Sequence, residues 1–186
     1  MRRLTSLLLA LTGIVCAVVV AFLIWERNTP RRLAFDLTQN PTVIANSGTA
    51  LPHILQIEGA GISLPIFPVE LSNGRWTAST AGVSYLASSA IPGEIGNSIL
   101  YGHNWPNLLG NLTQVKPGMQ VTVGFIAAAT QTFTVISTST VTPDQTHILN
   151  PSTDRRLTIY TCTGFLDSKR FVVVAIPSSQ FSKNTL

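Results

Sequence analysis

Hydrophobic residues are most concentrated in segment 4–25, LTSLLLALTGIVCAVVVAFLIW, which contains no charged side chain. An apolar run of about 20 residues can cross a bilayer as an α-helix, and Trp25 suits the headgroup layer at its end. We predict an uncleaved transmembrane signal-anchor over 4–25, preceded by a short tail, 1–3. A cleavable signal peptide is the alternative, with Arg2 and Arg3 as its basic start; however, the run is longer than a usual signal-peptide core and no Ala-x-Ala pattern follows it.

Residues 26–50 show no sustained hydrophobic period. They include Pro30, Pro41 and Gly48 among several Asn, Ser and Thr residues, a composition that is typical of linkers. We expect this linker to hold the following domain, residues 51–186, clear of the membrane.

Short apolar runs separated by Gly, Pro and Asn characterise residues 51–186. Val, Ile and Thr are abundant there, and along 119–125 every second residue is apolar, as in a half-buried strand. The predicted strands are 53–58, 62–67, 82–86, 97–102, 119–126, 131–137, 156–162 and 170–176. Many short strands joined by frequent turns predict an all-β domain, either a barrel or a sandwich.

One short helix is predicted at 105–113. Trp105, Leu108, Leu109 and Leu112 would share one of its faces, and Pro106 suits a first helical turn. Gly110 counts against a regular helix at this place.

The net charge of +4 is unevenly distributed. Residues 1–50 contain five Lys or Arg against two Asp or Glu, which leaves +3, whereas the remaining seven basic and six acidic residues leave +1. Because the excess flanks the predicted membrane span, it suits lipid headgroups and argues against nucleic-acid binding. Arginines lie on both sides of the span, so charge alone leaves its orientation open.

Only two cysteines occur, Cys16 within the predicted span and Cys162 in the β domain. The domain therefore has no internal disulfide and no metal site built on cysteine pairs. Taken alone, Cys162 is either a buried apolar filler or a reactive thiol.

Cys162 ends the predicted strand LTIYTC, and Arg170 begins the next one. Strand alternation sends Tyr160 and Cys162 to the same face. If the two strands pair as an antiparallel hairpin, Cys162 meets Arg170. A guanidinium beside a thiol can lower the thiol pKa or bind the oxyanion that forms when the thiolate attacks a carbonyl.

A histidine is the usual proton donor to a leaving amine near neutral pH. His103 closes the predicted strand SILYGH, directly after Gly102, and would project from a rim where strand ends meet. His53, at a strand start, and His147, in a loop, are the alternatives, although each suits an exposed or structural role. For His103 alone, a structural role also stays open.

Motifs for other chemistries are missing from the sequence. It contains no Gly-x-Ser-x-Gly, no Gly-rich phosphate loop and no His-Glu-x-x-His. Glu94, Asp144 and Asp154 are isolated carboxylates that we interpret as solvated surface groups.

At these residues the chain resembles the sortase family. TIYTC at 158–162 is similar to the sortase signature Thr-Leu-x-Thr-Cys, with Ile159 in place of Leu, and Arg170 follows Cys162 at the family's common spacing. GEIGNSILYGHNW at 93–105 resembles the segment in which a Gly-Asn pair leads through a hydrophobic strand to Gly-His.

Two further stretches extend the resemblance to about residues 51–177. GISLPIFPVEL at 61–71 resembles the early sortase strands, and LLGNLTQVKPGMQVTV at 108–123 resembles the helix and strand after the histidine. Asn104 stands where many relatives have Arg, and Cys162 is followed by a short loop. The resemblance is therefore closer to compact sortases of class A, D, E or F than to class B.

The resemblance implies a closed eight-stranded β-barrel with one or two short helices and a cysteine transpeptidase activity. Cys162 would form a thioacyl intermediate with a Leu-Pro-x-Thr-Gly-like sorting signal, His103 would exchange the protons, Arg170 would stabilise substrate or oxyanion, and Thr161 would contact the substrate. The acceptor amine would belong to a cell-wall precursor or a pilin, with water as the default acceptor. No metal or organic cofactor is implied.

The resemblance also implies a single-pass protein of the cell membrane. Its N-terminus would be cytoplasmic, and its catalytic domain would be extracytoplasmic. The main alternative is an inactive sortase-fold module that binds a partner at the cell surface, although all three catalytic positions are filled. An L,D-transpeptidase is a second alternative, but it would place its cysteine in a Ser-x-Gly-Cys context that Tyr160 and Thr161 do not match.

Overall fold

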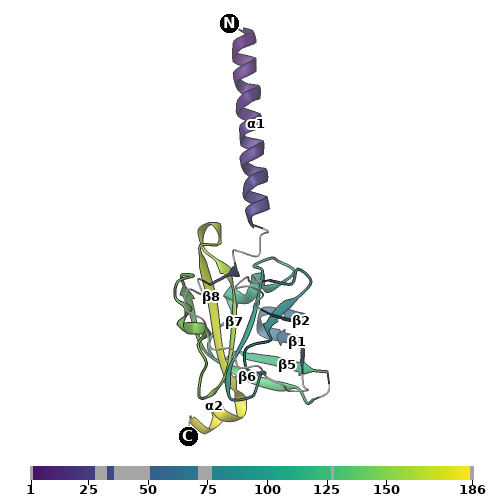
Figure 1. The fold of residues 1–186 in the computed structure, drawn as a ribbon, viewed down its shortest axis with the longest axis vertical. Helices are drawn as coiled ribbons and strands as arrows, with labels where there is room; N and C mark the ends of the chain where they lie inside the picture. The colour runs from purple at the N-terminus through teal and green to yellow at the C-terminus, as the bar shows by residue number, and fades with distance from the viewer. Residues whose placement is uncertain (1, 28–32, 36–50, 71–76, 127, 185–186) are drawn as a thin grey trace.

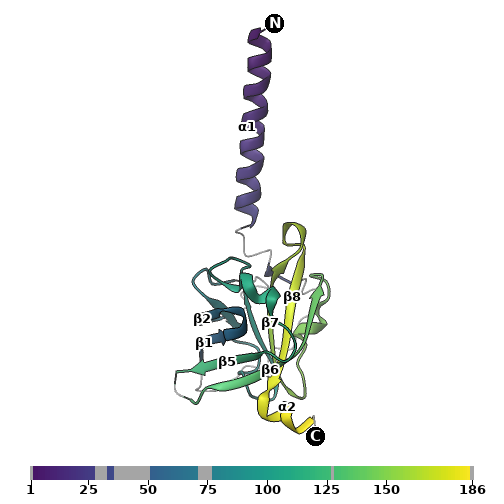
Figure 2. The same ribbon diagram turned by 180° about the vertical axis from the view of Figure 1, so that it is seen from behind.

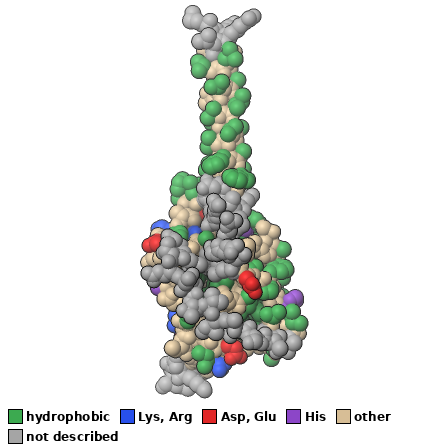
Figure 3. Space-filling view, in the orientation of Figure 1, with side chains coloured by type: hydrophobic (Ala, Val, Ile, Leu, Met, Phe, Trp, Pro, Cys, Tyr) green, Lys and Arg blue, Asp and Glu red, His purple; other side chains and the backbone are tan. Residues whose placement is uncertain are grey.

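The computed structural model of the protein describes residues 2–27, 33–35, 51–70, 77–126 and 128–184. An N-terminal helix, α1 (Arg2–Arg27), projects from a β domain (Figure 1). Its stretch Thr5–Trp25 is long and apolar enough to span a membrane, and none of it is buried inside the protein. Hydrophobic side chains line it in the space-filling view of Figure 3. The predicted span at 4–25 is thus helical, which is consistent with a signal anchor or a signal peptide.

The β domain is a closed barrel of eight strands, as the resemblance implied. The strands are β1 (Pro52–Ile57), β2 (Ile62–Val69), β3 (Val83–Leu86), β4 (Gly96–Gly102), β5 (Gln120–Phe125), β6 (Gln131–Val141), β7 (Arg155–Thr163) and β8 (Lys169–Pro177). Their order around the barrel is β1-β2-β3-β4-β7-β8-β6-β5. The pairs β2–β3 and β4–β7 are parallel. Every strand predicted from the short apolar runs is present, although β6 continues beyond the predicted end at 137.

The predicted helix at 105–113 is instead a turn followed by a 3-10 helix, η3 (Leu109–Gln114). The amide of Leu108 donates to the carbonyl of Trp105 at 2.9 Å in a tight turn, and the amide of Gly110 donates to the same oxygen at 2.9 Å across a wider turn. The chain here therefore does not follow the regular hydrogen bonds of an α-helix. A Cβ on Gly110 would lie 2.7 Å from that carbonyl oxygen, so the glycine permits the turn.

Short helices also occur outside the prediction. They are the 3-10 helices η2 (Glu58–Ala60), η4 (Thr146–Leu149) and η5 (Phe165–Asp167), and the C-terminal helix α2 (Ser178–Asn184). Helix α2 lies at the end of the barrel opposite α1 (Figure 2).

Two buried clusters occupy the two faces of β7. The first draws residues from all eight strands, including Leu157 and Ile159, and fills the barrel. The second contains Tyr160 and Cys162 and lies on the other face. The alternation of side chains along the strand accounts for this division, and it places Tyr160 and Cys162 on the same face, as the sequence predicted.

Loops cover the second cluster, and Asn97 holds one of them. Its Nδ2 donates to the carbonyl oxygens of Ile148 and Asn150 at 2.9 and 3.1 Å. Its Oδ1 accepts a hydrogen bond of 2.7 Å from the hydroxyl of Thr158. Asn97 therefore fixes the β6–β7 connection over strands β4 and β7, which gives a structural role to the Gly-Asn pair.

Most of the predicted linker lies outside the described residues. Its described part, residues 33–35, packs against the β domain, where Leu33 and Phe35 are 0% and 3% exposed. Both belong to the same buried cluster as Cys162. At least this part of the linker therefore serves as a docked segment.

Candidate active site

Cys162 and Arg170 lie directly opposite each other in the antiparallel pair β7–β8. The pairing continues to Thr163 opposite Lys169. Directly opposite residues in an antiparallel pair point to the same face, with Cβ atoms about 5 Å apart. The hairpin expected from the sequence therefore forms, and it brings thiol and guanidinium side by side.

His103 approaches this place from a third strand. Strand β4 runs parallel to β7, and the ladder ends with Gly102 opposite Thr161, so His103 and Cys162 are the next residues on the two strands. Tyr101 and Tyr160, two positions earlier, stack their rings with centroids 5.4 Å apart. Strand alternation then turns His103 toward the face that carries Cys162.

The three side chains thus come together at the ends of the adjacent strands β4, β7 and β8, and all three are buried. Their exposed fractions are 4% for His103, 3% for Cys162 and 2% for Arg170. Burial of a thiol, an imidazole and a guanidinium in one place strengthens the electrostatic interactions among them.

The Arg170 guanidinium binds peptide carbonyls. Its Nη1 donates to the carbonyl oxygens of Asp167 and Lys169 at 3.0 and 2.9 Å. Its Nη2 donates to the carbonyl oxygen of Ala34 at 2.8 Å. Its Nε is buried and has no hydrogen-bond partner among the described residues. Arg170 therefore holds its own hairpin turn and also a carbonyl from a distant part of the chain.

His103 is buried against an aromatic ring. Its ring stacks on Trp105, with centroids 4.3 Å apart and planes 11° apart, and its Nε2 has no hydrogen-bond partner among the described residues. Burial lowers the pKa of His103 below its ordinary value, and the negative charge of Asp167 opposes this shift in part. The neutral imidazole is therefore favoured in the resting protein.

The lowered pKa of His103 predicts how stability changes with pH. The ring binds a proton near pH 6.5 in the unfolded chain and only at lower pH in the folded one. Between these two pH values the unfolded state carries more protons, so the free energy of unfolding falls as the pH falls below about 6.5. We expect His103→Gln to flatten this dependence, measured as urea midpoints of the detergent-solubilised protein from pH 7.5 to about pH 5.

The exposed His53 offers a matched control for this measurement. His53→Gln should leave the pH dependence of the urea midpoint as it is in the unmodified protein. An equal slope in the His103→Gln variant and the unmodified protein would contradict the assignment to His103.

Thr161 has a clear structural contact. Its side chain is fully buried, and its hydroxyl donates to the carbonyl oxygen of Gly102 at 2.8 Å. This bond ties β7 to β4 one residue before Cys162 and His103, so Thr161 positions both. The predicted contact of Thr161 with substrate stays a prediction.

Residues 33–35 lie against the candidate site. The Phe35 ring packs edge-on against Tyr160, with centroids 5.0 Å apart, and the Arg170 guanidinium carbon lies 5.8 Å from the Phe35 centroid. With the Ala34 carbonyl bound by Arg170, a short peptide segment with two buried apolar side chains covers this face of the sheet.

This packing predicts that loosening the segment exposes the thiol. In a Cys16→Ala background, we expect Phe35→Ser to raise the rate of Cys162 alkylation at least about tenfold. Truncation of a buried Phe removes about 3–5 kcal/mol of packing, and 1.4 kcal/mol already changes an equilibrium tenfold. Mass spectrometry after timed iodoacetamide quenching measures the rate. Phe67→Ser, at a partly exposed phenylalanine of β2, is the control; an unchanged rate in Phe35→Ser would show that the segment does not shield the thiol.

The other histidines lie elsewhere. His53 on β1 and His147 in η4 are both exposed. Among the described residues, no group of three or more His, Cys, Asp or Glu side chains is arranged to hold a metal ion. Asp154 is partly exposed and forms an ion pair with Arg156 at 3.0 Å. This carboxylate was expected to be isolated, and it is not.

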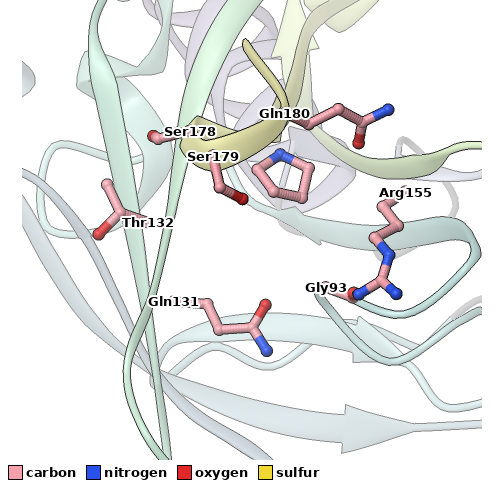
Figure 4. Close-up of a pocket in the computed structure, with 8 residues that line it drawn as sticks. Gly93, Gln131, Thr132, Arg155, Ser178, Ser179 and Gln180 are labelled. Atoms are coloured by element: carbon pink, nitrogen blue, oxygen red, sulfur yellow. The ribbon is translucent and has the colours of Figure 1, made fainter. Parts of the chain in front are cut away.

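A separate pocket of about 610 Å³ lies beside α2, at the end of the barrel opposite the candidate site (Figure 4). It is lined by residues that include Gln131, Arg155, Ser178 and Gln180. Arg155 begins β7, the strand that carries Cys162 near its other end. Its Nη1 donates to the carbonyl oxygen of Gly93 at 2.7 Å, so this guanidinium is already engaged. The pocket is thus remote from the buried thiol.

The sequence model of the sortase domain matches residues 55–178, which is more than half of the chain. The chain belongs to the sortase family. The matched region of this sortase includes the strand ends that carry His103, Cys162 and Arg170. A search among proteins of curated function finds no match.

Solved sortases share the fold of this sortase. Sortase A of Listeria monocytogenes is 23% identical, with a TM-score of 0.56, over 70% of this chain and 88% of that one. Sortase C1 of Streptococcus agalactiae is 26% identical, with a TM-score of 0.57, over 67% of this chain and 66% of that one. The sortase D5 transpeptidase of Clostridium perfringens is 20% identical, with a TM-score of 0.59, over 72% and 82%. These structural neighbours belong to classes A, C and D.

Three features of the site were not found from the sequence. They are the docked segment at 33–35, the stacking of Trp105 on His103 and the charge of Asp167 near that ring. The two apolar residues Leu33 and Phe35, directly before Asp36 in the linker, were a signal for docking. Trp105 and Asp167 had no comparable signal, because their contacts depend on loop conformation.

Proposed function

We propose that this sortase is an active cysteine transpeptidase in which Cys162 is the nucleophile, His103 the proton carrier and Arg170 the carbonyl-binding group. The observation that supports this most strongly is a hydrogen bond of 2.8 Å from Arg170 to the peptide carbonyl of Ala34. Arg170 makes this bond from the position on β8 directly opposite Cys162. A guanidinium that holds a peptide carbonyl beside a thiol suits the attack of that thiol on a peptide bond.

In the acylation half of the reaction, the Cys162 thiolate attacks the carbonyl carbon of a peptide bond in the sorting signal. The Arg170 guanidinium donates to the oxyanion of the tetrahedral intermediate. When the intermediate collapses, the C–N bond breaks and the protonated His103 imidazole gives its proton to the leaving amine. The products are a thioester on Cys162, a free amine and a neutral His103.

In the second half, an acceptor amine attacks the thioester carbonyl. Neutral His103 takes a proton from this amine, the C–S bond breaks, and Cys162 leaves as a thiolate. Water in place of the amine gives hydrolysis. The thiolate and the imidazolium are restored together, so the catalytic cycle is balanced without any cofactor.

The lowered pKa of His103 has a consequence for this cycle. Because burial favours the neutral ring, few resting molecules hold the imidazolium that acylation requires at neutral pH. The negative charge of Asp167 raises the pKa of His103 and so increases this fraction. Asp167 thereby supports proton donation without touching the substrate.

We further propose that α1 is retained as a signal-anchor, with the N-terminus in the cytoplasm and the barrel outside. Sorting signals of secreted proteins and the amine of a cell-wall precursor or pilin then meet the enzyme at the extracytoplasmic face of the cell membrane. The length of Thr5–Trp25 and its lack of burial support an anchor.

The test of this function is a direct search for the thioacyl intermediate. The detergent-solubilised full chain is incubated with a library of Leu-Pro-x-Thr-Gly-like peptides, and intact-mass and peptide-mapping spectrometry locate any adduct. We expect a mass increase on Cys162 equal to the N-terminal peptide fragment, and its transfer to an added amine. If no peptide in the library acylates the protein, the inactive binding module becomes the better description.

A further inference from the structure

The hairpin that joins β7 to β8 ends in an exposed hydrophobic tip. Phe165 is 85% exposed and its neighbour Leu166 is 50% exposed. Both belong to η5, which begins three residues after Cys162. Adjacent large apolar side chains in contact with water at a loop tip indicate a surface that meets an apolar partner.

The backbone of the tip adopts a conformation that L-residues rarely choose. Leu166 has φ 50° and ψ 37°, and Asp167 follows with φ 58°, so two successive non-glycine residues are left-handed. Such residues cost free energy and persist only where the surroundings hold them. The Arg170 guanidinium, bound to the Asp167 carbonyl oxygen at 3.0 Å, is one such restraint. The turn that displays the apolar pair is therefore tied to the candidate site.

The tip lies at the end of the barrel nearest α1, as both ribbon views show (Figures 1 and 2). A hydrophobic group is visible at the same end in the space-filling view (Figure 3). Covalent geometry supports this placement independently. Leu33 is docked in the Cys162 cluster and follows the last residue of α1, Arg27, by six peptide units, which span at most about 22 Å.

The charges near the tip also suit a membrane surface. Lys169 is exposed at the base of the hairpin, and Arg27, Arg31 and Arg32 follow the apolar stretch of α1 in the sequence. The charge of Asp167 acts on His103. An exposed lysine beside an apolar tip, in a chain whose sequence is basic after its apolar stretch, fits anionic lipid headgroups over a hydrocarbon layer.

We propose that Phe165 and Leu166 insert into the interfacial layer of the bilayer that α1 crosses, as a second membrane contact of the protein. A bilayer is favoured over a protein partner because two adjacent apolar residues make a narrow tip rather than a broad face. The insertion would hold the Cys162 end of the barrel toward the membrane surface. It rests on α1 being retained as the anchor, as proposed above.

Spin-label depth measurements on the full chain test this inference. The protein is reconstituted into vesicles of phosphatidylcholine and phosphatidylglycerol, and each label is probed with oxygen, which concentrates in lipid, and with a water-soluble nickel chelate. One sample carries the label on native Cys16 in a Cys162→Ala background. Two others carry it at Phe165→Cys or Ile95→Cys in a Cys16→Ala, Cys162→Ala background. Ile95 is 67% exposed and directly precedes β4, at the opposite end from the site.

The measured quantity is the ratio of each label's accessibility to oxygen over its accessibility to the nickel chelate. We expect this ratio to be several-fold higher at position 165 than at position 95, and lower at position 165 than at Cys16 in α1. A label at position 165 that meets the chelate as freely as the one at position 95, while Cys16 is shielded, overturns the insertion. The tip would then face water and fit a protein surface. A Cys16 label open to the chelate would overturn the anchor itself, so the two failures are distinguishable. Circular dichroism melts confirm that each variant is folded.

Discussion

Replacement of Cys162 by alanine is expected to abolish formation of the thioacyl adduct and to lower peptide cleavage at least about 10⁴-fold, since loss of a covalent nucleophile has effects of this size. The side chain is only 3% exposed and packs in the cluster of Tyr101 and Tyr160. Alanine removes a single atom there, so the fold should persist with a small loss of stability. Peptide cleavage followed by chromatography, together with intact-mass spectra, gives the result.

The second cysteine of the chain supplies the matched control. Cys16 lies on α1, where it is exposed, and Cys16→Ala should leave both cleavage and adduct formation unchanged. Cys162→Ser tests whether a weaker nucleophile of similar shape suffices, and we expect it to remain inactive at neutral pH. Cleavage by Cys162→Ala at the original rate would require a different nucleophile and would remove the basis of the proposed function.

Removal of the Arg170 guanidinium is expected to lower kcat by about 10²- to 10³-fold, as is typical when a donor to an oxyanion is lost. The effect should appear in kcat more than in KM, because the interaction strengthens as charge develops on the carbonyl oxygen. Steady-state cleavage by Arg170→Ala and Arg170→Lys measures it. Lysine keeps the charge but not the planar fork of donors, so we expect it to restore only part of the rate.

Arg170 also supports the fold, which the experiment has to separate from catalysis. The residue is 2% exposed, and its guanidinium donates to the carbonyl oxygens of Asp167 and Lys169. Loss of these bonds should lower the melting temperature of both variants. The rates are therefore compared well below the melting transition, on samples with matched circular dichroism spectra. Undiminished kcat in folded Arg170→Ala would exclude an oxyanion role and leave Arg170 as a structural residue of the hairpin.

The two proposals about the membrane and the active site are connected through the β7–β8 hairpin. Arg170 binds the carbonyl of Asp167 in the turn, and Phe165 and Leu166 lie at its tip. On the other side of the guanidinium, Ala34 belongs to the segment that leads back to α1. Arg170, opposite Cys162 in the sheet, thus joins the turn that carries the exposed tip to the docked segment 33–35. If the tip inserts as proposed, membrane attachment would act on the residues that cover the site.

The sequence alone determined the elements of this protein to a large extent. Short apolar runs rich in Val, Ile and Thr, separated by Gly, Pro and Asn, placed all eight strands, because β-branched residues suit a buried sheet and the separating residues suit turns. The uncharged run at 4–25 predicted a helix by length and composition alone. The spacing from Cys162 to Arg170 predicted their pairing, because a hairpin with a short loop has a local register that its own residues set.

Only the tertiary structure decided how His103 joins that pair. Strands β4 and β7 are parallel neighbours, although more than fifty residues separate Gly102 from Thr161, and hydrophobic alternation carries no information about which distant strands become neighbours. The docked segment at 33–35 and the tight turn before η3 likewise depend on long-range packing and on backbone bonds to single carbonyls. Local patterns therefore supplied the strands and the Cys162–Arg170 hairpin, while the closure of the barrel brought the imidazole to the thiol.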